Sequence, residues 1–295
     1  MNWHRVWAVT RTDLRQLAKS RDYWLPMGLL AGLFFIVVPV VALNIVSGAQ
    51  DSEVVNQIGT VLETLPLTIQ ENIQGDSPEV RAAFAIAVYL LAPIAVVVPL
   101  TIAAAVGSNT IVGERERGTG EFLAHSPITE RELYAGKLLA ALIPGYGATL
   151  VGFGVYSLLV NLIVGPDLGG WFFPTSGWWV LILWVVPPAI AIALSLIVRI
   201  SARVNSAAAA QQAASLVSLP VIVIAYAVAS GLVYDPARTG LITGLLAWII
   251  AYVGLASGSR ALRREILLGI GINSPKRVSV PRKSPVPAAA PPAGE

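Results

Sequence analysis

The sequence predicts an all-α integral membrane protein with six transmembrane helices. Charged residues make up 13% of the chain, mean hydropathy is +0.70, and long stretches carry no charge at all. Soluble domains contain about 25% charged residues, so this deficit favours a lipid environment. We expect three parts: an interfacial helix at residues 1–23, a six-span domain at residues 24–260, and a basic, proline-rich, disordered cytoplasmic tail at residues 261–295.

Six apolar windows are long enough to span a bilayer, since a helix needs about 20 residues to cross a hydrocarbon core of ~30 Å. None of the windows contains a charged residue. Prolines inside them or at their ends predict kinks, whose free carbonyls neighbouring helices can satisfy. The windows are Trp24–Val46, Phe84–Val112, Leu138–Val164, Trp178–Val198, Ala210–Val233 and Leu241–Gly258.

Lysine and arginine lie almost entirely on one side of these predicted spans. Of the 20 basic residues, 18 fall in the N-terminal segment, the second and fourth inter-span loops and the C-terminal tail. Arg81 and Arg238 are on the other side. Because loops rich in Lys and Arg stay in the cytoplasm, both termini are predicted to be cytoplasmic. The layout is that of a multi-pass protein of a prokaryotic cell (inner) membrane.

Residues 2–23 have the pattern of an amphipathic helix. Trp3, Val6, Trp7, Leu14 and Leu17 recur at helical spacing, with basic residues on the other faces. This pattern is typical of a helix that lies at the membrane surface, with membrane lipid as its partner. The alternative, the basic start of a signal peptide, is disfavoured because no A-x-A-like cleavage site follows the apolar run.

The first outer loop, at residues 47–81, carries six acidic residues and one basic residue. Its apolar residues between 54 and 65 have helical spacing and precede Pro66. They predict a second amphipathic helix. This helix would either cap the external end of a pathway or lie on the outer surface.

The most densely charged part of the chain is residues 113–137, below called the charged segment. Its sequence, GERERGTGEFLAHSPITERELYAGK, has nine charged residues in 25 positions between two uncharged runs. We expect a helix to about His125, a break at Ser126-Pro127 and a second helix capped by Thr129 and Glu132. The result is a helix–break–helix elbow. Its mixed charges favour a protein partner, whereas a nucleic-acid surface would be mainly basic.

Several chemistries have no support in the sequence. There is no Cys and there are only two His, which disfavours a metal site. No charged residue within a span could relay protons or sense voltage. No phosphate-binding G-x-x-x-x-G-K-[ST] motif occurs, and no nucleophile–base pair is visible. Energy for any uphill transport must therefore come from another polypeptide.

The charged segment resembles the first cytoplasmic loop of type-2 ABC transporter permeases. That family has an E-x-E-x-G-T-x-E-x-L run, a Pro, a later Glu and a Gly-Lys pair between its second and third spans. Gly120 departs from the pattern, since an aliphatic residue is usual there. A weaker resemblance covers residues 200–212. The matching residues, in register, are Glu114, Glu116, Gly118, Thr119, Glu121, Leu123, Pro127, Glu132, Gly136 and Lys137.

This resemblance implies a permease subunit without ATPase activity, which pairs with a second permease subunit and docks on a cytoplasmic ABC ATPase. ATP and Mg would bind that partner, and this chain would hold no cofactor or metal. The elbow, including Arg115 and Arg117, would sit in a cleft of the ATPase. Glu114, Glu116, Thr119 and Glu121 would contact the ATPase or orient the elbow, with bends at Pro127 and Gly136. The alternatives are a merely solvated loop and, for Lys137, a positively charged anchor at the start of a span.

The leading functional interpretation is ATP-driven export through a six-span permease. A related one is a system that maintains a metalloenzyme or assembles a cell-surface structure. Two interpretations come from other classes: a membrane scaffold that moves no solute, and a passive channel. The apolar spans are compatible with lipids, hydrophobic drugs, peptides or polymers as substrates, and with either a homodimer or a heterodimer.

Overall fold

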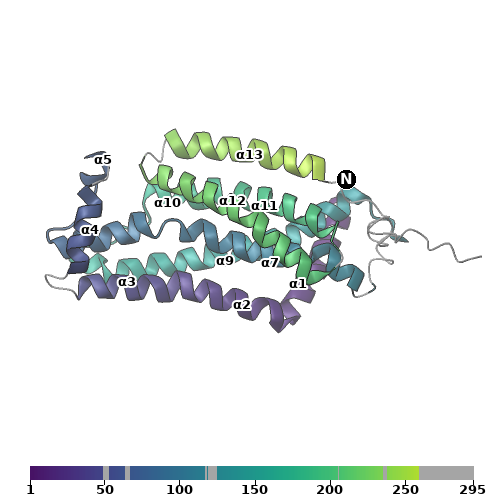
Figure 1. Ribbon diagram of the computed structural model, residues 1–295, viewed down its shortest axis with the longest axis horizontal. Coiled ribbons are helices and arrows are strands. Elements are labelled where there is room, and N and C mark those ends of the chain that lie inside the picture. Colours follow the sequence, from purple (N-terminus) through teal and green to yellow (C-terminus); the bar gives the residue numbers. More distant parts are fainter. Residues whose placement is uncertain are drawn as a thin grey trace, which may run out of the picture.

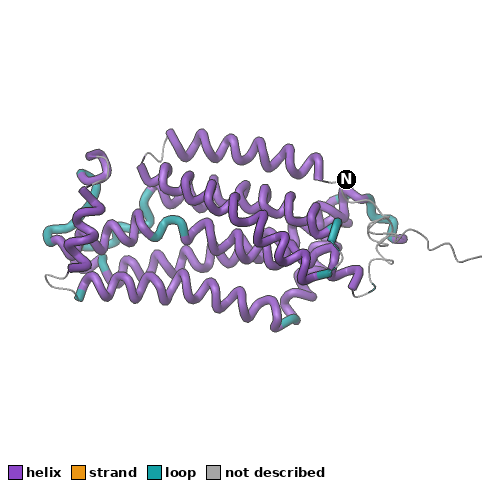
Figure 2. The backbone as a smooth tube through the Cα atoms, in the orientation of Figure 1, coloured by secondary structure: helices purple, strands orange, loops and turns teal. Residues whose placement is uncertain are grey.

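The computed structural model describes residues 1–48, 53–63, 67–116, 118, 125–204, 206–234 and 238–258. Over these ranges the chain forms helices joined by turns, without any strand (Figure 2). The long helices lie alongside one another in an elongated bundle (Figure 1). The prediction of an all-helical fold is confirmed for these ranges.

The helices follow the predicted order. They are α1 (Trp3–Lys19), α2 (Arg21–Gly32), η1 (Leu33–Val37), α3 (Val38–Ser47), α4 (Glu53–Glu63), α5 (Leu67–Gln70), α6 (Pro78–Ala85), η2 (Ile86–Leu90), α7 (Ile94–Glu116), α9 (Glu130–Ile163), η3 (Gly165–Leu168), α10 (Ser176–Val180), η4 (Leu181–Val185), α11 (Val186–Ser201), α12 (Ala207–Tyr234) and α13 (Arg238–Gly258).

Five helical stretches in the described part of the chain are long and apolar enough to cross a membrane. They are Tyr23–Ser47, Pro78–Glu114, Glu130–Ile163, Ser176–Ser201 and Gly240–Gly258. The sixth predicted window falls on α12, where the described apolar stretch Ala208–Ile224 is shorter. The structure thus supports a multi-pass membrane protein with at least five spans, and the sixth span stays a prediction.

Helix α7 forms the centre of the bundle. It packs against α9, α11 and α12, and α13 lies against α11. In Figure 1, α13 forms one edge, α2 and α3 form the other, and α4 and α5 lie at the end opposite the N-terminus. The interior holds fully buried Leu100, Ile102, Ile190 and Leu194. Large apolar side chains remain exposed along the outer helices, as expected for surfaces that face lipid.

Three π-helical turns interrupt the spans, each shortly before a proline. The turn η1 precedes Pro39, η2 precedes Pro93, and η4 precedes Pro187. Proline lacks an N–H group, and its ring clashes with the carbonyl four residues earlier. A wider π turn relieves that clash. The structure thus converts the predicted kinks into local widenings.

Side chains from neighbouring helices bond to carbonyls of the most irregular stretch. The chain makes a turn between η2 and α7 at residues 91–93. The hydroxyl of Tyr156 donates to the Ala87 carbonyl at 2.6 Å, and the Trp178 indole N–H donates to the Val88 carbonyl at 2.9 Å. Both donors are buried. This arrangement confirms that neighbouring helices satisfy backbone groups beside a proline.

Small residues allow close helix packing, as their spacing indicates. A Cβ at Gly152 would collide with the Phe35 ring, and one at Gly244 would collide with the Trp184 indole. These glycines therefore bring α9 against η1 and α13 against η4.

Both predicted amphipathic helices form. Helix α1 buries Val6, Val9 and Thr10 against the bundle, while Trp3 and Trp7 are 64% and 54% exposed. It therefore docks on protein along one face, a contact that its spacing does not reveal. Helix α4 occupies the predicted outer position. Residues 64–66 lie outside the described ranges.

Candidate functional site

The two ends of the charged segment adjoin two long helices. Helix α7 extends to Glu116, and Gly118 follows with φ of +73°, a left-handed conformation that favours glycine. Helix α9 begins at Glu130 after the break at Ser126-Pro127. Residues 117 and 119–124 lie outside the described ranges, so the first half of the elbow stays a prediction.

The predicted capping box at the start of α9 is present. The Glu132 backbone N–H donates to the Thr129 hydroxyl at 3.3 Å, and the Thr129 N–H donates to the Glu132 carboxylate at 3.0 Å. These bonds satisfy two donors that a helix start leaves unpaired. They also hold the carboxylate of Glu132, which is 3% exposed, in one orientation.

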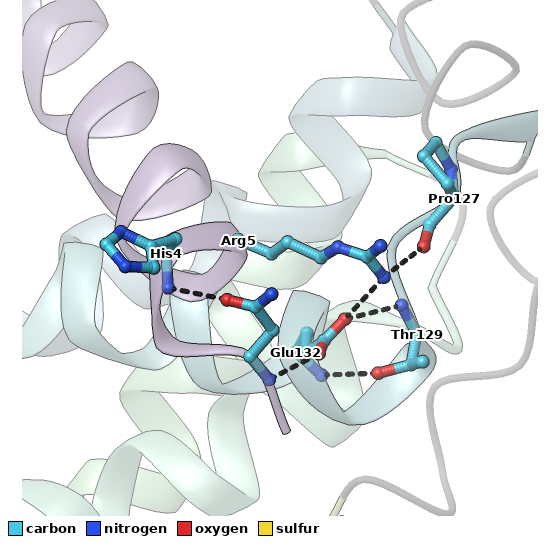
Figure 3. A network of polar contacts seen from close by, with 6 residues as sticks. His4, Arg5, Pro127, Thr129 and Glu132 are labelled. Atoms are coloured by element: carbon cyan, nitrogen blue, oxygen red, sulfur yellow. Dashed lines mark hydrogen bonds and ion pairs between the residues drawn. The ribbon is translucent and has the colours of Figure 1, made fainter.

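The same carboxylate connects the charged segment to the N-terminus of α1 (Figure 3). It accepts a hydrogen bond of 2.6 Å from the Asn2 backbone N–H. The Arg5 guanidinium lies 3.8 Å from it and donates to the Pro127 carbonyl at 2.9 Å. Asn2 in turn caps α1 by accepting from the His4 N–H. One buried acid thus fastens two helix starts that are 130 residues apart in sequence.

A second buried cluster joins the other end of the charged segment. The Lys137 ammonium lies 2.6 Å from Glu114 and 3.0 Å from Asp13. Lys137 is 1% exposed and Glu114 is 5% exposed. Since buried charges are tolerated only when they are paired, this cluster holds α1, α7 and α9 together. Lys137 lies within the protein, whereas an anchor at the membrane surface would be exposed.

Gly136 allows α1 to approach α9 closely. A Cβ at this position would lie 2.8 Å from Cβ of Val9 and 3.1 Å from the Val6 carbonyl oxygen. The Thr10 hydroxyl donates to the Val6 carbonyl at 2.9 Å and approaches the Gly136 carbonyl at 3.2 Å. Gly136 therefore serves as a contact point with α1 in a continuous helix.

The predicted site residues separate into two described groups. Glu114, Glu132, Gly136 and Lys137 are buried and come together against α1, whereas Glu116, Gly118 and Pro127 are exposed. The side chain of Arg115, together with Arg117, Thr119, Glu121 and Leu123, lies outside the description. Their proposed contact with an ATPase stays a prediction.

Sequence reasoning missed the residues of α1 that hold the charged segment. Asn2, Arg5, Thr10 and Asp13 all contact it. One signal was available, because Asp13 is the single acid within α1. An acid on a basic helix that faces the membrane indicates an internal ion pair, and Lys137 is its partner.

The arrangement can transmit force but shows no centre for bond chemistry. Among the described residues, His, Asp and Glu form no group of three that could hold a metal ion. The buried contacts connect the charged segment to α1, α7 and α9. A displacement of the segment would therefore move three helices, two of which are candidate spans.

The fold and the site define a multi-pass helical membrane protein with a charged segment fastened to its bundle. The profile of the family described as "ABC-2 family transporter protein" matches residues 7–265. The chain therefore belongs to this family of ABC transporter permeases, which are membrane subunits and are generally not catalytic themselves. Membership implies an ABC ATPase as partner. No curated protein matches the chain.

Proposed function

We propose that this chain is the permease subunit of an ATP-driven exporter and that residues 113–137 receive the force from a separate cytoplasmic ABC ATPase. The ATPase would bind ATP and Mg, and a second permease subunit would complete the transporter. ATP-driven closure of the ATPases would favour one state of the spans over the other, because the nucleotide binds the two states unequally.

The contact that carries this proposal is the buried cluster of Asp13, Lys137 and Glu114. It ties the end of α7 and the start of α9 to each other and to α1. Glu116, one turn beyond Glu114 near the end of α7, is exposed. A partner that engages the exposed surface would thus act on a rigid base, and the spans would move with it.

Export through six spans is the expected topology, with both termini in the cytoplasm of a cell with an inner membrane. Helix α12 would be the sixth span. Because the chain has no Cys, single cysteines give an unambiguous test. In sealed inside-out vesicles, Arg203→Cys should react with a membrane-impermeant thiol reagent and Gly59→Cys should not. The reverse pattern would exclude this orientation.

The ATPase docking is tested by co-purification from native membranes with a C-terminal tag. Wild type would be compared with Glu116→Lys and with Glu53→Lys, an exposed acid on α4 at the opposite end of the bundle. We expect an ABC ATPase with wild type and Glu53→Lys, and its loss with Glu116→Lys. If no ATPase associates with wild type, even after crosslinking, the scaffold interpretation replaces transport.

A further inference from the structure

A cavity of about 670 Å³ opens between α9 and α13, with α11 as its floor. It lies at the end of the bundle where α9 begins and α13 ends, which is also the end near the N-terminus (Figure 1). Its size is within the ~300–1,000 Å³ of common ligand pockets. The contacts described for the charged segment do not use it.

The walls of this cavity are apolar and belong to candidate spans. Leu138 and Leu142 come from α9, Leu194 from α11 and Leu255 from α13. All four lie in helices that are long and apolar enough to cross a membrane. The molecule that adjoins such a surface is a lipid, so the walls fit an acyl chain.

The mouth of the cavity is basic and aromatic. Arg131 lies in the first turn of α9 and is exposed, and Trp3 lines the opening from α1. No Asp or Glu lines the cavity. Arginine binds phosphate oxygens in a bidentate manner, and tryptophan favours the depth of lipid headgroups. The mouth therefore complements an anionic headgroup.

Tyr134, which also lines the cavity, has an unused polar group. Its side chain is 3% exposed, and its hydroxyl makes no hydrogen bond with the described residues. The hydroxyl abuts Gly258 near the end of α13, where a Cβ would collide with it. A buried hydroxyl without a partner is uncommon in proteins. An oxygen of a bound headgroup would supply the missing acceptor.

We propose that this cavity binds one anionic phospholipid from the adjoining leaflet. Its phosphate lies on Arg131 and the Tyr134 hydroxyl, and an acyl chain follows Leu138 and Leu142 between α9 and α13. The lipid then fills the gap between the two helices beside the start of the charged segment. This site is independent of ATPase docking and is tested on the permease chain alone.

Native mass spectrometry of the detergent-purified full-length chain measures this binding. Equal amounts of dioleoylphosphatidylglycerol and dioleoylphosphatidylcholine would be offered to wild type, Arg131→Gln, Tyr134→Phe and Ala135→Trp. Ala135 lines the cavity, and an indole there would fill it. The matched control is Arg203→Gln, an exposed arginine away from the cavity. Unchanged thermal unfolding would show that each variant is folded.

We expect wild type and Arg203→Gln to retain the phosphatidylglycerol adduct in preference to phosphatidylcholine. Loss of the arginine should weaken the adduct by about tenfold, the factor for one charged hydrogen bond. Ala135→Trp should abolish the adduct. Equal binding of the two lipids, or unchanged binding in both Arg131→Gln and Ala135→Trp, would overturn the proposal.

A photoactivatable phosphatidylglycerol locates the lipid directly. With a diazirine on its acyl chain, it should label peptides of α9 and α13 around Leu142 and Leu255. Excess unlabelled phosphatidylglycerol should compete with this labelling, and phosphatidylcholine should not. Labelling confined to other spans, or no labelling because residues 259–295 or a second chain fill the cavity, would refute the assignment.

Discussion

The Lys137 ammonium lies 2.6 Å from the Glu114 carboxylate, so a buried ion pair joins the end of α7 to the start of α9. Asp13 of α1 is the second acid on the same ammonium, at 3.0 Å. The pair brackets the charged segment, because Glu114 is its second residue and Lys137 its last. The segment therefore has a closed base, whatever its tip contacts.

Replacement of Lys137 by methionine should strongly destabilise the protein. The substitution leaves Glu114 and Asp13 without their cation, and breaking a buried ion pair in this way costs about 3–5 kcal/mol. We expect a clearly lower midpoint of thermal unfolding in detergent. Lys19→Met removes an exposed lysine from α1 and should leave the midpoint unchanged.

A rescue experiment separates charge burial from packing. The triple variant Asp13→Leu, Glu114→Leu and Lys137→Met has no charge left in the cluster and should recover much of the lost stability, since apolar replacements of buried ion pairs are often neutral. If the triple variant is less stable than Lys137→Met alone, the three side chains do not form one coupled cluster.

Gly136→Ala should loosen α1 from the bundle. Its new methyl group would lie 2.8 Å from Cβ of Val9, and such overpacking costs about 1–3 kcal/mol. Gly147→Ala is the matched control on the same helix, because nothing lies within 4 Å of a Cβ at that position. Limited proteolysis should cut within residues 1–20 faster in Gly136→Ala than in the control. Equal rates would show that α1 docks elsewhere.

Trp178→Phe should lower stability, although it keeps an aromatic ring in place. The substitution removes the N–H group that donates to the Val88 carbonyl at 2.9 Å, and a buried carbonyl without its donor costs about 1–3 kcal/mol. Trp171→Phe, at a position 71% exposed, is the control. Thermal unfolding of both variants checks this expectation, which an unaltered midpoint for Trp178→Phe would contradict.

Glu132→Gln should release the N-terminus of α1 more than it disturbs α9. A carboxamide offers one acceptor oxygen where the carboxylate offers two, which here serve Asn2 and Thr129. It also loses the ion pair with Arg5. Hydrogen exchange should become faster at residues 2–6, with little change in the middle of α9. Glu71→Gln, on an exposed acid after α5, should leave both regions unchanged.

Much of the fold could be predicted because single residue patterns determine it. Uncharged runs as long as a bilayer is thick locate the spans, and Thr129 with Glu132 defines the start of α9. The π turns were not predictable in detail, since a proline specifies that the helix must adjust but not how. Tyr156 and Trp178 supply donors from distant helices, and no local pattern reveals that pairing.

The candidate site was predicted in part, for a similar reason. The ordered motif of residues 113–137 identified Glu114 and Lys137 individually, and the structure pairs them with each other. Their third partner, Asp13, lies on a helix whose spacing indicated only a membrane surface. Contacts between elements far apart in the chain depend on how helices pack, which amphipathic periodicity alone does not determine.

The most direct test of the central claim places a photocrosslinking amino acid in the charged segment of the chain in its native membrane. The probe would replace Glu116, which is exposed near the end of α7, and in a control Val54, which is exposed on α4 at the opposite end. We predict that position 116 crosslinks to an ABC ATPase, more strongly in one nucleotide state than in the other, and that position 54 does not. Absence of any ATPase adduct at position 116, with the protein folded and in its membrane, would contradict the account.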